Sequence, residues 1–161
     1  MKQPTPKNTG DDRAMLDELI KYEHDPEGRF VGLPLCVKQL DRRMYKLERD
    51  VTYFTEDGEL LTVMAPFRFD FASVPRFLWW LYPPKGTKKN PYGIAALIHD
   101  WLLKHKKIGG RKITRPEADA IFLEVMLYTG CRKTLCRTMY TAVGINTFLK
   151  RMNPWREKWP K

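Results

Sequence analysis

Hydrophobic and polar residues alternate along residues 45–53, as they do in a strand with one buried face. A second apolar run at residues 60–64 follows the pair Asp57-Gly58, which tolerates the positive φ angles of a tight turn. We therefore predict a β-hairpin here. Further strands are predicted at residues 33–37, which Pro34 restricts to a sheet edge, and at 67–71, where phenylalanines alternate with Arg68 and Asp70. The pattern predicts a short antiparallel sheet of three to four strands.

The remaining apolar positions recur every three or four residues, which indicates helices. Thr114 and Glu117 form a capping box at the start of one helix, and Gly130 is suited to its end. About four helices are predicted after the sheet, at residues 73–82, 92–103, 114–128 and 134–152. We therefore expect one α+β domain at residues 30–152. It is preceded by an N-terminal appendage at 1–29, which consists of a tail and a short helix predicted at 11–22, and followed by a basic, aromatic tail at 153–161.

His99 and Asp100 interrupt the most apolar predicted helix, at 92–103. They lie opposite its main apolar stripe, and alanines and leucines surround them there. Burying an ionisable group without a partner costs roughly several kcal/mol or forces the group into its neutral form. Asp119, at the margin of the next helix's apolar stripe, is the partner we expect for His99. In that arrangement Asp119 fixes the imidazole and leaves its other nitrogen to accept a proton from water. Asp100 is then available to a hard divalent cation, Ca²⁺ first, together with loop carbonyls. The alternative is a structural polar cluster that pins one helix on the other.

Charge is unevenly distributed along the chain, whose formal net charge is +10. Residues 51–161 carry nineteen basic and nine acidic side chains, so the whole excess lies there. The C-terminal cations and tryptophans suit an acidic surface: phospholipid, nucleic acid or an acidic protein. These residues are Lys150, Arg151, Trp155, Arg156, Lys158 and Trp159. The alternatives are a solvated basic face and tryptophans that fold back on the domain.

Three cysteines without metal-site spacing favour a reduced, intracellular setting. We find neither a secretory signal pattern nor an apolar run approaching the roughly 18 residues of a membrane span. A soluble protein without a transmembrane segment is therefore expected.

Three motifs in order resemble the phage and prophage proteins grouped as domain of unknown function 1353: residues 70–76 (DFASVPR), 96–102 (ALIHDWL) and 115–122 (RPEADAIF). The resemblance covers roughly residues 30–150. It implies a bacteriophage or prophage origin, and hence the cytoplasm of an infected bacterium or a virion, with other phage proteins as partners. It implies no activity. Leu103 stands where that family often has tyrosine.

A shorter stretch is similar to the phospholipase domain of parvoviral capsid proteins, through a Pro/Gly loop at 82–86, His99-Asp100 and Ala118-Asp119. This similarity implies that His99 is a general base, Asp119 its orienting partner and Asp100 a calcium ligand. The tyrosine expected at Leu103 is missing, and the loop is not a clear calcium loop.

The sequence also contains residues for two other kinds of hydrolytic site. ALIHDWL looks like the metal-binding helix of HD-type phosphohydrolases, but the only upstream histidine is His24. Ser73 would complete a triad with His99 and Asp119, yet it lacks the G-x-S-x-G elbow and is explained as a helix N-cap. Asp70 and Arg76 are expected to form an ion pair at this strand-to-helix junction. The sequence leaves two functions open: metal-assisted ester or phosphoester hydrolysis, or a non-enzymatic virion component or host-interaction module.

Overall fold

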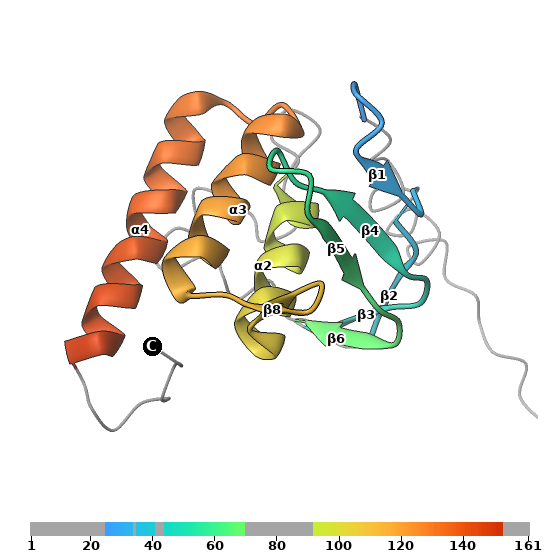
Figure 1. The fold of residues 1–161 in the computed structure, drawn as a ribbon, viewed down its shortest axis with the longest axis horizontal. Coiled ribbons are helices and arrows are strands. Elements are labelled where there is room, and N and C mark those ends of the chain that lie inside the picture. The colour runs from blue at the N-terminus through green and yellow to red at the C-terminus, as the bar shows by residue number, and fades with distance from the viewer. Residues whose placement is uncertain (1–24, 34, 41–43, 70–91, 153–161) are drawn as a thin grey trace, which may run out of the picture.

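The computed structural model describes residues 25–33, 35–40, 44–69 and 92–152, and within the last helix it describes side chains through residue 145 (Figure 1). The strands are β1 (Phe30–Val31), β2 (Val37–Gln39), β3 (Tyr45–Leu47), β4 (Val51–Phe54), β5 (Leu60–Val63), β6 (Phe67–Phe69), β7 (Lys107–Ile108) and β8 (Arg111–Lys112). The helices are α2 (Gly93–His105), α3 (Arg115–Tyr128) and α4 (Lys133–Met152). The predicted α+β class is confirmed. Three helices are described, against about four predicted after the sheet. The predicted helices at 11–22 and 73–82 lie outside the described residues.

Two three-stranded antiparallel sheets, ordered β1-β4-β5 and β2-β3-β6, share one long hairpin. Strands β4 and β5 pair Val51 with Val63, and β3 and β6 pair Leu47 with Phe67, which is the same register continued along both arms. The predicted turn is confirmed: the Thr55 N–H donates to Glu59 O at 3.0 Å. Buried side chains therefore lie on one face of both sheets, as the alternation along the chain requires.

The predicted continuous strand at 45–53 is wrong in one respect, because residues 48–50 separate β3 from β4. The opposite arm contains Pro66, which has no N–H to donate to a ladder. Here the Asp50 side chain replaces ladder bonding by accepting the Ala65 N–H at 2.7 Å. The strand predicted at 33–37 is also wrong: β1 ends at Val31 and β2 begins at Val37.

The segment between α2 and α3, predicted as a loop, is a two-stranded hairpin of β7 and β8. Lys107 pairs with Lys112, and Ile108 with Arg111, across a Gly109-Gly110 turn. A glycine pair is itself a hairpin signal, because glycine accepts φ angles such as the +53° of Gly109. The apolar runs beside it are too short to show alternation, so the pattern alone missed the strands.

The helix predicted to be mostly buried is α2, whose residues 93–99 are all buried. At the start of α3 both halves of the predicted capping box form, with Thr114 accepting from the Glu117 N–H and Glu117 accepting from the Thr114 N–H. At its end Gly130, at φ 83°, donates its N–H to Leu127 O at 3.1 Å. Local sequence signals therefore decide where α3 begins and ends.

The helices lie to one side of the strands, with α2 nearest the sheets, α3 beside it and α4 outermost (Figure 1). The core fills the space between the buried faces of β3 to β6 and α2, and continues between α2, α3 and α4. Helix α2 is therefore covered on both sides, which explains why it is apolar almost all round. No helix in the described part of the chain is both long and apolar enough to cross a membrane.

Candidate functional site

His99 of α2 and Asp119 of α3 are in direct contact, as the sequence predicts. The distance from His99 Nε2 to Asp119 Oδ1 is 2.8 Å. Both side chains are buried, with exposed fractions of 1% and 5%. A hydrogen bond between two buried side chains is stronger than one in water and holds both groups in a single orientation.

The approach of the two helices depends on small residues and on the connection between them. Ala95 and Ala96 of α2 and Ala118 of α3 have no exposed surface. Side chains of this size let neighbouring helices come close. The β7–β8 hairpin turns the chain so that the middle of α2 meets the first turns of α3, which places Asp119 at His99.

The aromatic ring of Phe122 completes the environment of the imidazole. Phe122 follows Asp119 by three residues, so both lie on one face of α3. Its ring stacks on that of His99, with centroids 4.8 Å apart and an interplanar angle of 29°. Asp119 thus holds the edge of the imidazole and Phe122 its face. The structure leaves open which of the two ring nitrogens of His99 carries the proton, because either tautomer can bond to Asp119 according to the protonation of the carboxyl.

Asp100 follows His99 on α2 and is half-buried. A calcium ion needs about six to eight oxygen ligands, and one carboxylate supplies at most about two of these ligands. Within the described ranges, no three His, Cys, Asp or Glu side chains are grouped to hold a metal ion. The carbonyls expected from the loop at 82–91 lie outside these ranges. The residues described therefore do not form a cation site by themselves.

Comparison with known protein families identifies the family of this chain. A family model described as "Protein of unknown function (DUF1353)" matches residues 45–143, more than half of the chain. The chain belongs to the DUF1353 family. The matched segment runs from β3 into α4, so it contains the long hairpin and both residues of the His99–Asp119 pair. No curated protein and no solved structure matches the chain.

Several residues predicted from the sequence fall outside what the structure describes. Asp70, Ser73 and Arg76 lie within the segment that matches the family. The tail residues lie beyond it: Trp155, Arg156, Lys158 and Trp159. Lys150 and Arg151 lie in the last turn of α4, where no side chain is described. The roles proposed for these residues stay predictions.

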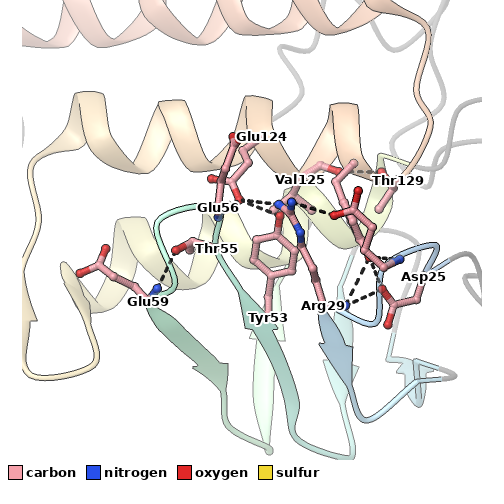
Figure 2. Close-up of polar contacts among 11 residues, drawn as sticks. Asp25, Arg29, Tyr53, Thr55, Glu56, Glu59, Glu124, Val125 and Thr129 are labelled. Carbon is pink, nitrogen blue, oxygen red and sulfur yellow. Dashed lines mark hydrogen bonds and ion pairs between the residues drawn. The ribbon is translucent and has the colours of Figure 1, made fainter.

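A polar network that the sequence did not predict joins the long hairpin to α3 (Figure 2). Glu124 of α3 accepts hydrogen bonds from Tyr53 Oη at 2.8 Å and from the Glu56 N–H at 2.7 Å. Arg29 lies 3.8 Å from the same carboxylate. Burial, and then the bond to Glu124, raise the pKa of Tyr53, so its hydroxyl remains a neutral donor. The Tyr53 and Glu124 positions are 71 residues apart, and no local pattern connects them.

The same network includes the short segment before β1. Tyr128, at the end of α3, donates its hydroxyl to Asp25. The Asp25 carboxylate also accepts the backbone N–H groups of Arg29 and Phe30, at 2.8 Å and 2.9 Å. Arg29 lies over the Tyr128 ring, 4.9 Å from its centroid. These contacts attach residues 25–31 to α3.

A surface cavity of about 380 Å³ lies between the hairpin turn and α3. Glu56, Glu59, Glu117 and Glu124 line it together with Arg111. Arg111 bonds to both carboxylate oxygens of Glu59 at 2.9 Å and to Glu117 at 2.7 Å. His99 and Asp119 do not line this cavity, so the acidic cavity and the buried pair are separate features of α3.

Proposed function

We propose that the protein is a small hydrolase in which His99 is the general base and Asp119 its orienting partner. The observation that carries this proposal is the buried 2.8 Å contact between His99 Nε2 and Asp119 Oδ1. A carboxylate that fixes one imidazole nitrogen leaves the other with a defined direction, which is the arrangement used for proton transfer in acid–base catalysis.

In this proposal His99 Nδ1 takes a proton from a water molecule as that water attacks the carbonyl carbon of an ester or the phosphorus of a phosphoester. The bond to the alcohol oxygen then breaks, and the imidazolium returns the proton to the departing alcohol. The imidazolium that forms is stabilised by Asp119, which keeps its negative charge throughout. The stacked ring of Phe122 prevents the imidazole from turning away. General-base catalysis of this kind contributes a rate factor of roughly 10² to 10⁴.

A divalent cation, Ca²⁺ first, is proposed at Asp100 together with oxygens from the loop at 82–91. Such an ion would polarise the bond under attack. Because the described residues do not form that site alone, the reaction is written only through His99 and Asp119.

The burial of the pair favours a second candidate function. At exposed fractions of 1% and 5%, His99 and Asp119 also fit a structural polar core that joins α2 to α3. In this alternative the protein is a non-enzymatic virion component or host-interaction module. Both candidates share a proposed bacteriophage or prophage origin, with action in the infected cell's cytoplasm or in the virion and with other phage proteins as partners.

The tail at residues 153–161 is proposed to contact an acidic surface. Deleting residues 154–161 should then weaken binding to polyanions.

The test compares hydrolysis by the wild type, His99→Gln and His105→Gln. His105 lies on the same helix but is exposed, so it is a matched control for losing one histidine. Substrates are bis(p-nitrophenyl) phosphate, p-nitrophenyl esters and mixed phospholipid vesicles, each with Ca²⁺ and with EDTA. Circular dichroism confirms that every variant is folded.

The hydrolase proposal expects a loss of at least about 100-fold for His99→Gln and no change for His105→Gln. Wild-type protein that hydrolyses none of these substrates, or a folded His99→Gln variant with unchanged rates, would support the structural alternative. A dependence on Ca²⁺ that Asp100→Asn abolishes would support the proposed cation site.

A further inference from the structure

Three cations lie side by side on the outer face of the sheet β2-β3-β6. In the register of this sheet Lys38 is directly opposite Lys46, and Lys46 is directly opposite Arg68. Their neighbours along each strand point into the core, so the three side chains share the solvent face. We call Lys38, Lys46 and Arg68 the cationic row.

The cationic row opposes the stability of the sheet. Like charges directly opposite one another on adjacent strands repel. Lys46 is partly compensated by Glu48, whose carboxylate lies 3.7 Å away. Among the residues that the structure describes, no carboxylate forms an ion pair with Lys38 or Arg68, and both are exposed. An arrangement that does not help the fold points to an anionic ligand.

We propose that the cationic row binds the phosphodiester backbone of a nucleic acid. Strands lie about 4.8 Å apart, so the row is a rigid line of positive charge about 10 Å long. Nucleic acids present closely spaced phosphates along a line, and lysine and arginine bind them by releasing counterions.

The rest of the hairpin face argues against a phospholipid surface as the ligand. The exposed apolar residues of the hairpin, Phe54, Leu60 and Met64, lie on its β4–β5 half, away from the row. Beside the row, the exposed large apolar residue among those described is Leu40, two residues after Lys38. Exposed Asp50 lies opposite Met64 in the continued register, and exposed acidic residues follow at the turn. A flat anionic membrane that touched both ends would meet these carboxylates. A narrow strand of phosphates can follow the row without approaching them.

The experiment measures binding of the full chain to fluorescent 20-nucleotide single-stranded and double-stranded DNA by anisotropy, between 50 and 200 mM salt. The test variant is Lys38→Gln/Arg68→Gln. The matched control is Lys133→Gln/Arg137→Gln, which removes the same charge from exposed positions on α4. Because the row repels itself, the test variant should be at least as thermally stable as the wild type, so a loss of binding does not reflect unfolding.

We expect the test variant to bind at least about tenfold more weakly and the control to change less than about threefold. The slope of log K against log salt should become less steep in the test variant by about 1.4 for single-stranded and about 1.8 for double-stranded DNA, because two phosphate contacts are lost. The single-stranded and double-stranded arms identify which form of the backbone is preferred. Equal losses in both variants, or no binding by the wild type, would overturn the proposal. So would vesicle binding that depends on the row in the absence of DNA binding.

Discussion

The contact between Tyr53 and Glu124 allows a quantitative test of what holds the hairpin against α3. Tyr53 has no exposed surface, and its hydroxyl donates to Glu124 at 2.8 Å. The Glu124 side chain is 20% exposed and also accepts the Glu56 N–H at 2.7 Å. Removing either partner therefore has unequal consequences, because the hydroxyl is buried and the carboxylate can reach water.

Glu124→Ala leaves the buried hydroxyl without its acceptor, which costs about 1–3 kcal/mol, and removes the second bond at Glu56. We expect a loss of about 2–3 kcal/mol in the free energy of unfolding. Tyr53→Phe removes the donor while Glu124 keeps its backbone bond and its access to water, so about 1 kcal/mol is expected. For a chain of this length each kcal/mol lowers Tm by about 2–4 °C. Glu124→Gln keeps an acceptor oxygen and should lie between the wild type and Glu124→Ala.

The assay is urea unfolding of the wild type, the two single variants and the double variant Tyr53→Phe/Glu124→Ala. In the double variant no buried hydroxyl is left unpaired, so its loss should be smaller than the sum of the single losses by about 1 kcal/mol or more. If the single effects add within about 0.3 kcal/mol, the two groups are not coupled and the reasoning is refuted. Unchanged m-values would show that the comparison concerns one folded state.

The pH dependence gives an independent check of the same contact. Burial and the bond to Glu124 raise the pKa of Tyr53 above its ordinary value of about 10. Above pH 10 the unfolded chain therefore loses this proton before the folded chain does, and stability falls as the pH rises. Below pH 10 the contribution is fully present. The stability difference between the wild type and Tyr53→Phe should shrink above pH 10, and a difference that stays constant to pH 11 would contradict the assignment.

Three further predictions follow from single positions. Asp119→Ala should lower the free energy of unfolding by about 2–4 kcal/mol in urea titrations, because it removes the buried carboxylate bonded to His99 Nε2; an unchanged value would mean that this bond does not stabilise the fold. Thr114→Ala should cost about 1 kcal/mol and raise the pKa of Glu117 only part of the way from about 2, because the backbone N–H bond of residue 114, the largest cause of the lowering, stays and only the hydroxyl bond is lost. Carboxyl NMR titration measures this shift. The bonded carboxylate of Glu117 stabilises the fold above about pH 4.5, and this contribution is lost as the pH falls toward 2; in the variant the contribution should be smaller. Gly32→Ala should cost roughly 2–5 kcal/mol by thermal unfolding, because its Cβ would lie 2.3 Å from a carbonyl oxygen at φ 96°. Gly28→Ala, at φ 69° with nothing within 4 Å, should cost only about 1 kcal/mol, and equal losses would exclude the clash as the cause.

Features set by neighbouring residues were predictable from the sequence. The capping box of Thr114 and Glu117 and the turn at Asp57-Gly58 form as expected, because their hydrogen bonds span only a few residues. The contact between His99 and Asp119 was also predictable, although the residues are twenty positions apart. An ionisable group within an apolar helix needs a partner, and the next helix offered Asp119 at the margin of its apolar stripe.

The tertiary structure decided what depends on pairing between distant segments. The break between β3 and β4 comes from Pro66 on the opposite arm, and Glu124 acquires its role only when the hairpin turn lies on α3. The same holds for the cationic row: Lys38, Lys46 and Arg68 are ordinary surface residues in three separate strands of the sequence. Strand register alone brings them into line, because it sets which side chains face one another across a sheet.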